Sequence, residues 1–131
     1  MQILIAGGSG PIGTALTKSL LAEGHQVAIL TRYPQRARLA EGVRGIGWDG
    51  RTITGWGELA SRVDAIVNLA GESLGSGPWT RERKTRILSS RVESGKAIYD
   101  AIRFPKRLQE LGFRFCFETA EAVSMDRLQV P

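Results

Sequence analysis

The sequence predicts an α/β protein with a parallel sheet whose strands are covered on both faces. Short apolar runs without alternation, such as residues 2–6, recur along the chain and are typical of such strands. The segments between these runs are compatible with helices, which indicates right-handed strand-helix-strand crossovers. A glycine-rich turn joins the first run directly to the first predicted helix.

The chain has 131 residues, enough for one domain with its own core. No run reaches the ~18 continuous apolar residues that a membrane span needs. The N-terminus lacks the basic and then apolar pattern of a secretory signal, so a cytoplasmic location is expected. The single cysteine, Cys116, cannot form an internal disulfide.

Two strands around one helix are predicted at the N-terminus. A strand is expected over residues 2–6, and the helix starts at Pro11, because the first helical position does not need the amide hydrogen that proline lacks. Gly24 is placed to end this helix, and a second buried strand follows over residues 26–31. The helix face expected to be buried carries Ile12, Leu16 and Leu20.

Two further strands and a long helix are predicted next. A short third strand is expected near residues 43–48, and a clearer fourth strand over residues 65–70. A loop over residues 71–78 leads to Thr80, which can cap a helix that runs to about Arg103. The stripe expected to face the sheet consists of Leu88, Val92, Gly95, Tyr99 and Ile102.

Pro105 interrupts the helical pattern, and a short α/β tail is expected after it. This tail contains a predicted helix over residues 106–111 and an alternating strand over residues 113–117. The expected domains are therefore residues 1–103 and the short C-terminal segment 104–131.

Gly7, Gly10 and Gly13 lie at three-residue spacing between the first strand and the first helix. Such a turn needs one glycine for a sharp reversal, one for close approach of backbone amides to a diphosphate, and one for close helix packing. The helix N-terminus then faces the anion with unpaired amides and a partial positive charge. This context predicts a nucleotide site, and an ordinary glycine-rich turn is the alternative.

The end of the second predicted strand indicates which nucleotide binds. NAD sites usually carry Asp or Glu there, whereas a nearby Arg accommodates the 2′-phosphate of NADP. Thr31 and Arg32 occupy this place, and no acidic residue lies between Gly24 and Ala40. NADP is favoured over NAD, because a guanidinium can hold two phosphate oxygens. The alternative is that Arg32 only faces solvent.

Positive charge is concentrated in two groups, within a chain of 18 basic and 13 acidic residues and a net charge of +5. Basic clusters bind polyanions such as nucleic acid or nucleotide phosphates, and solvated faces are the alternative. The tryptophans are dispersed, which disfavours an aromatic platform for nucleic acid. The groups are Arg32, Arg36 and Arg38, and Arg81, Arg83, Lys84, Arg86 and Arg91.

The glycine turn also resembles a family signature. Residues 7–13 are similar to the signature of extended short-chain dehydrogenase/reductases, and Asp64 with residues 68–71 resembles their fourth-strand motif. More narrowly, the chain resembles the epimerase family related to nucleoside-diphosphate-sugar epimerases, some of whose members are labelled cell-division inhibitor homologues. The motifs are Leu30-Thr31-Arg32, Trp48-Asp49, Asn68-Leu69-Ala70-Gly71-Glu72, Trp79 and Ser90-Arg91-Val92-Glu93-Ser94.

This resemblance covers residues 1 to about 103 and implies a Rossmann-like doubly wound sheet, truncated after its fourth strand. Residues 105–115 resemble the C-terminal segment of full-length members, which are more than twice as long as this chain. The simplest interpretation is a family member that lacks its central and substrate-binding segment. The fourth strand is then an open sheet edge, which is expected to pair with another copy of the chain or with the predicted C-terminal strand over residues 113–117; the first pairing predicts a homodimer.

The resemblance further implies which residues hold the cofactor. Pro11 departs from the bulkier residue often found at its position, but the turn itself is retained. The resemblance assigns Gly7, Gly10, Pro11, Ile12 and Gly13 to the diphosphate, Thr31 and Arg32 to the 2′-phosphate, Leu69, Ala70 and Gly71 to the adenine and ribose side, and Glu72 and Arg91 to further contacts.

The family's catalytic Tyr-x-x-x-Lys pair, in which the lysine lowers the phenol pKa, is absent. Tyr33 is followed four residues later by Ala37, and Tyr99 by Arg103, so a packing role is favoured for Tyr99. The sequence therefore indicates an NADP-binding, epimerase-like and oxidoreductase-like protein that is catalytically incomplete. A fragment of an active nucleotide-sugar epimerase-like oxidoreductase is the alternative, and a basic nucleic-acid-binding module is disfavoured.

Overall fold

The computed structural model describes residues 1–103, which form a parallel four-stranded sheet with helices on both faces. The spatial order is β3-β2-β1-β4, so the chain crosses from one side of β1 to the other after β3. This order is that of the doubly wound fold, and the Rossmann-like prediction is confirmed. The strands are β1 (Gln2–Ala6), β2 (Gln26–Thr31), β3 (Arg44–Gly47) and β4 (Ala65–Asn68). The predicted tail elements lie outside the described residues.

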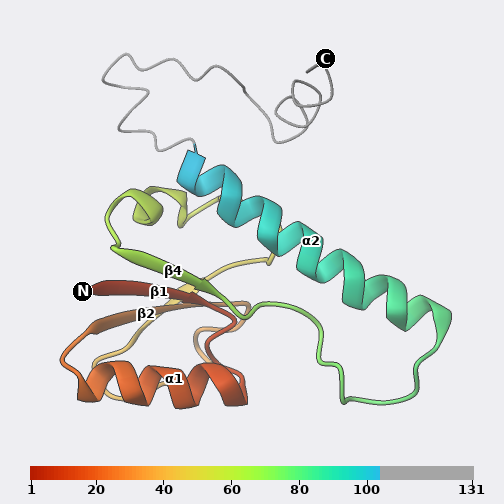
Figure 1. Ribbon diagram of the computed structural model, residues 1–131, viewed down its shortest axis with the longest axis horizontal. Coiled ribbons are helices and arrows are strands. Elements are labelled where there is room, and N and C mark those ends of the chain that lie inside the picture. Colours follow the sequence, from red (N-terminus) through yellow and green to blue (C-terminus); the bar gives the residue numbers. More distant parts are fainter. Residues whose placement is uncertain (104–131) are drawn as a thin grey trace, which may run out of the picture.

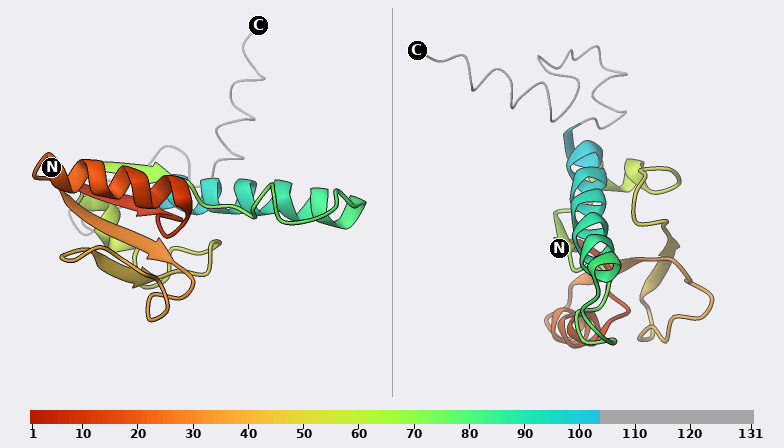
Figure 2. Two further views of the ribbon diagram at one scale, coloured as in Figure 1. Left: turned by 90° about the horizontal axis from the view of Figure 1, so that it is seen from below. Right: turned by 90° about the vertical axis from the view of Figure 1, so that its right-hand side faces the viewer.

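One helix covers each face of the sheet (Figure 1). Helix α1 (Pro11–Ala22) packs on one face, and α2 (Arg81–Arg103) packs on the other together with the short 3-10 helix η1 (Gly57–Ser61). The N-terminal end of α2 projects beyond the sheet, with the loop that follows β4 beside it (Figure 2). The carboxyl ends of β1, β2 and β4 therefore meet at one edge, next to the start of α1.

Two apolar layers hold this arrangement together. Successive side chains of a strand point to opposite faces, so the apolar runs of β1 and β2 supply both layers. Ile3 pairs with Val27 and Ile5 with Ile29 in the parallel register, and these four residues form the layer under α1. The layer under α2 contains Leu4, Ala6, Leu30, Trp48, Trp56, Ala97, Ile98 and Ala101.

The predicted buried stripe of α1 is only partly correct. Leu16 and Leu20 pack against the layer under α1, but Ile12 is 72% exposed. The side of α1 nearest the sheet carries the buried Gly13 and Thr17, because these small side chains let the helix approach closely. Ile12 therefore faces outward at the start of the helix.

The predicted buried stripe of α2 is wrong. Leu88, Val92 and Ile102 are each more than half exposed, and Tyr99 is 39% exposed, so its expected packing role is also wrong. The buried side combines Ile87 and Ile98 with small residues, which allow close contact with the sheet. The buried residues of α2 are Arg83, Ile87, Ser94, Ala97, Ile98 and Ala101.

The connections between strands differ from the helices expected. The segment between β2 and β3 forms turns without an α-helix, and the segment between β3 and β4 contains only η1. The latter is held by Trp48 and Trp56, whose indole nitrogens both donate to the Thr52 carbonyl, at 2.7 and 2.8 Å. The Thr80 cap is confirmed, because its hydroxyl accepts the Arg83 amide at 3.2 Å.

Candidate functional site

The glycine turn packs directly against the end of β4. Gly7 has φ +72°, a conformation that favours glycine, and a Cβ there would lie 2.8 Å from the backbone of Ala70. The Gly7 amide donates to the Leu30 carbonyl at 2.9 Å, and the Gly10 amide donates to the Gly7 carbonyl at 3.3 Å. These contacts bring the ends of β1, β2 and β4 together around the turn.

The start of α1 presents backbone amides at this edge. Gly10 precedes the helix in an extended conformation, and Pro11 takes the first helical position as predicted. The first intrahelical bond runs from the Thr14 amide to the Gly10 carbonyl at 2.8 Å, so the amides of Ile12 and Gly13 have no partner inside the helix. A Cβ on Gly13 would lie 2.4 Å from Cα of Gly8, and only glycine fits between helix and turn.

Two hydroxyls meet at the end of β2. Ser9 Oγ and Thr31 Oγ1 are 3.5 Å apart, and Thr31 Oγ1 also lies 3.5 Å from the Tyr33 amide nitrogen. Arg32 is exposed beside them and has no ion-pair or hydrogen-bond partner within residues 1–103. Arg36 lies over the Tyr33 ring, with its guanidinium carbon 5.8 Å from the ring centre. This corner therefore offers hydroxyl and guanidinium donors without a carboxylate.

The end of β4 carries the remaining predicted residues. The Leu69 amide donates to the Ala6 carbonyl at 2.9 Å, and the Ala70 amide donates to Asn68 Oδ1 at 3.1 Å. Gly71 has φ +151°, and the Arg91 side chain lies over it, so that a Cβ on Gly71 would meet Arg91 atoms at 3.2 Å.

Glu72 ties this corner to α2 through three contacts. Its amide donates to the Ser90 hydroxyl at 2.9 Å, and its carboxylate pairs with Arg86 at 3.2 Å. Its carbonyl accepts a hydrogen bond from Arg91 at 3.3 Å, while the same Arg91 nitrogen also donates to the Ile87 carbonyl. Arg91 is therefore placed at the carboxyl edge, as the resemblance implied, but it contacts the protein's own backbone there.

Arg83 organises the loop after β4, a role that the sequence did not indicate. It is only 5% exposed, and its guanidinium donates to the carbonyls of Ser73, Leu74, Gly77 and Pro78. Arg83 belongs to a run of basic residues, and such a run usually forms a solvated face. The sequence therefore does not distinguish Arg83 from its neighbours.

Most side chains of the basic face expected on α2 bind other groups of the protein. Arg83 is buried, Arg86 pairs with Glu72, and Arg91 donates to backbone carbonyls. Only Arg81 and Lys84 extend from this group without such a partner among the described residues, so the group does not form one continuous solvated face.

The tyrosines lie apart from one another and from any lysine partner. The Tyr99 hydroxyl accepts a hydrogen bond from Arg103, whose guanidinium carbon lies 5.7 Å from the Tyr99 ring centre. This end of α2 lies beside η1, away from the glycine turn (Figure 1). Residues 1–103 hold no cluster of His, Cys, Asp or Glu arranged for a metal ion, and none of their helices is long and apolar enough to cross a membrane.

The structure brings the predicted site residues to one edge of the sheet. Backbone amides from α1, hydroxyls and a guanidinium from the end of β2, and the small residues after β4 surround the glycine turn. The residues so gathered are Gly7, Gly10, Pro11, Ile12, Gly13, Thr31, Arg32, Leu69, Ala70, Gly71, Glu72 and Arg91.

Known proteins are similar in sequence to this chain over most of its length. The epimerase family protein SDR39U1 of Bos taurus is 39% identical over 105 residues, which are 78% of this chain and 32% of that protein. The epimerase family protein SAR0825 of Staphylococcus aureus (strain MRSA252) is 30% identical over 103 residues, 78% of this chain and 33% of that protein. The chain therefore spans about a third of the length of these curated relatives.

Solved structures agree with the fold. The crystal structure of human SDR39U1 (isoform2) with NADPH matches with a TM-score of 0.55 and 34% identity, over 78% of this chain and 32% of that chain. The UDP-glucose 4-epimerase of Thermus thermophilus, in complex with NAD, gives a TM-score of 0.65 at 24% identity, over 81% of this chain and 35% of that chain, and supports the fold alone. A model of the NAD dependent epimerase/dehydratase family matches residues 3–123, and the chain belongs to that family.

Proposed function

We propose that this chain binds NADP at the carboxyl edge of its sheet and performs little or no chemistry by itself. The observation that carries the proposal is the pairing of two features at that edge. Unpaired amides at the start of α1 offer a diphosphate site, and Arg32 stands at the end of β2 where an NAD site would carry an acid.

The glycine turn fits a diphosphate. Gly8 and Gly13 are in close contact, and Gly10 has open space on its Cβ side, with only the Gly7 carbonyl oxygen 3.6 Å away. A phosphate can therefore approach the amides of Ile12 and Gly13 without meeting a side chain from Gly10. The partial positive charge of the α1 N-terminus stabilises the anion there.

The corner at β2 fits a 2′-phosphate. The hydroxyls of Ser9 and Thr31 lie together, and the exposed Arg32 follows Thr31 directly, so hydroxyl and charged donors are supplied at the same strand end. Human SDR39U1, whose crystal structure contains NADPH, is 34% identical to this chain and supports the choice of NADP over NAD.

The end of β4 would face the adenine and ribose side of the cofactor. Leu69, Ala70 and Gly71 carry no polar side chains of their own, and the Arg91 side chain lies over Gly71. Arg91 would have to exchange its bonds to the Glu72 and Ile87 carbonyls for a cofactor oxygen, so we assign it a contact formed only on binding.

NADP, when bound, supplies or accepts a hydride. An epimerase or reductase also needs a positioned group that moves a proton. Tyr99 lies near Arg103, away from the glycine turn. No tyrosine among the described residues forms a Tyr-x-x-x-Lys pair. The chain's own residues therefore bind and orient the cofactor without completing a catalytic site.

The direct test is titration of NADPH and NADH by calorimetry, with Arg32→Ala as the variant. NADPH is expected to bind more tightly than NADH, and Arg32→Ala should weaken NADPH roughly 10–100-fold, the cost of one or two charge-assisted hydrogen bonds. NADH binding should change little.

Arg62→Ala is the matched control, because Arg62 is an exposed arginine at the other edge of the sheet. It removes the same charge and should leave both affinities unchanged. Equal affinity for the two cofactors, unaffected by Arg32→Ala, would reject the 2′-phosphate assignment. Absence of binding by either cofactor would reject the proposed function as a whole.

We also propose a homodimer through β4. This strand pairs with β1 on one side and with no strand on the other among residues 1–103, and an open edge can pair with a second copy. Light scattering after size exclusion should show a dimer at high concentration, and a monomer throughout would contradict the proposal.

The other candidate is a piece of a longer active enzyme, which the coverage of only a third of each relative favours. The mass of the protein isolated from its source distinguishes the two. A value near 14.3 kDa supports the short cofactor-binding protein, and a mass about three times larger supports the enzyme.

A further inference from the structure

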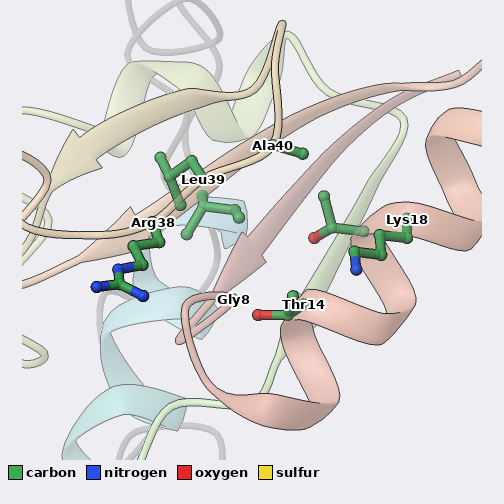
Figure 3. Close-up of a pocket in the computed structure, with 8 residues that line it drawn as sticks. Gly8, Thr14, Lys18, Arg38, Leu39 and Ala40 are labelled. Carbon is green, nitrogen blue, oxygen red and sulfur yellow. The ribbon is translucent and has the colours of Figure 1, made fainter.

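A hollow lies on the α1 face of the sheet (Figure 3). One wall is α1, the other is the loop after β2, and the base is formed by Ile29 of β2 and Gly8. Its volume is about 270 Å³, just below the ~300–1,000 Å³ typical of sites for drug-sized ligands. The size therefore suits a small molecule.

The charged groups around this hollow are all positive. Lys18 lines it from α1 and Arg38 from the facing loop, so each wall carries one basic residue (Figure 3). Neither has an ion-pair or hydrogen-bond partner within the described part of the chain, and no carboxylate lines the hollow. An anion placed between them would meet two cations and no like charge.

A buried hydroxyl provides an independent observation. Thr17 lines the hollow, is only 3% exposed, and its Oγ1 has no hydrogen-bond partner. Buried polar groups are nearly always paired, so an unpaired one needs an explanation such as a missing ligand. Thr14, one turn earlier on the same face of α1, directs its hydroxyl into the same gap (Figure 3).

The remaining lining is apolar. Ile29 forms the base, and Leu39 and Ala40 form part of the loop wall. A bare inorganic anion would leave these surfaces against water, whereas a short hydrocarbon group would cover them. The lining thus matches a molecule with a negative head and a small apolar body.

We propose that the hollow between α1 and the loop after β2 binds a small aliphatic carboxylate, with its head between Lys18 and Arg38 and its hydrocarbon part against Ile29 and Leu39. The Thr17 hydroxyl turns toward the bound carboxylate and gains its missing partner. The hollow adjoins the glycine turn through Gly8, and the proposal does not require NADP to be bound.

The test uses sodium hexanoate as the probe, followed by amide chemical shifts of the full 131-residue chain. Saturable shifts are expected at Thr17, Lys18 and Leu39, with millimolar affinity. Hexan-1-ol, which has the tail without the charge, and inorganic phosphate, which has charge without a tail, should each bind at least tenfold more weakly.

Substitutions then separate the charged contacts from general effects. Arg38→Gln and Lys18→Gln should each weaken hexanoate about tenfold, because each removes one charge-assisted contact. Arg62→Gln, an exposed arginine outside the hollow, should leave the affinity within twofold. Thr17→Val keeps the shape and removes only the hydroxyl, and it should weaken hexanoate several-fold.

Several results would overturn the proposal. Hexanol or phosphate binding as tightly as hexanoate would exclude the amphipathic anion. Equal affinities for Arg38→Gln and Arg62→Gln would exclude the charged head site. Displacement of hexanoate by NADPH would assign the hollow to the cofactor instead. Arg32→Ala is expected to leave hexanoate binding unchanged. The carboxylate proposal and the NADP proposal can therefore be refuted independently.

Discussion

Replacement of Arg83 by methionine is expected to release the loop that joins β4 to α2. Methionine keeps much of the apolar stem of arginine and removes the guanidinium. The four carbonyls that Arg83 binds, from Ser73 to Pro78, would lose their common donor. The loop contributes almost no apolar burial of its own, because its residues are exposed, so little else holds it in place.

The size of the effect follows from these contacts. A single hydrogen bond from a charged donor contributes ~1.5–3 kcal/mol, but the released carbonyls in an exposed loop regain water, so the values do not add. We therefore expect a loss of about 2–3 kcal/mol in the free energy of unfolding. A domain of this size loses ~4–8 °C in Tm per kcal/mol, so Tm should fall by roughly 10–20 °C.

Thermal unfolding followed by circular dichroism measures this loss, and hydrogen exchange of the amides in residues 73–77 reports the loop directly. Arg83→Lys should give an intermediate result, because an ammonium is a compact donor that cannot span the same carbonyls. Arg81→Met is the matched control, since Arg81 is exposed on the same turn of α2, and its Tm should change by less than a few degrees. Equal shifts for Arg81→Met and Arg83→Met, or unchanged exchange in the loop, would refute the reasoning.

Three further substitutions test other contacts. Gly13→Ala should lower the free energy of unfolding by about 1–3 kcal/mol in chemical denaturation, because its Cβ would lie 2.4 Å from Gly8; an unchanged midpoint would contradict the close packing. Thr17→Val should raise stability by about 1 kcal/mol in the same assay, since it removes a buried unpaired hydroxyl, and a loss of stability would show that this hydroxyl is satisfied. Hydrogen bonds from the backbone amides of Thr52 and Arg51 hold the pKa of Asp49 below its usual 3.8, so its charge stabilises the fold above that pH and this contribution is lost as the pH falls through the lowered pKa. Asp49→Asn should therefore reduce the acid dependence of Tm, and identical pH profiles would contradict this.

Local signals predicted the site-forming half of the fold well. The strand, the glycine turn and the helix start at Pro11 each depend on backbone geometry within a few residues. The structure places these elements as expected. The cap at Thr80 follows the same logic, because one side chain and one nearby amide are enough to form it.

The orientation of the helices was less predictable. Two stripes of α2 have helical spacing, the expected one with Leu88 and Val92 and another with Ile87 and Ile98 among small residues, and both contain apolar side chains. The structure buries Ser94, Ala97 and Ala101 because close approach to the sheet outweighs the burial of Leu88 and Val92. Arg83 was missed for a related reason, since its acceptors are backbone carbonyls that carry no sequence signal.

The donors proposed for the cofactor lie close together in the sequence. A chain that spans a third of the length of its relatives can therefore contain all of them. The amides at the start of α1 and the Arg32 guanidinium are supplied by β1, α1 and β2, which are consecutive in the sequence and pack on one another. Proton transfer has no such local source in residues 1–103, since neither tyrosine has a lysine partner there. Among residues 1–103, β4 has an open edge and α2 leaves Leu88, Val92 and Ile102 exposed, and both features are typical of surfaces that bind further protein. The proposed dinucleotide site therefore needs only donors from consecutive elements, the α1 amides and the Arg32 side chain, whereas a Tyr-x-x-x-Lys pair is absent from residues 1–103.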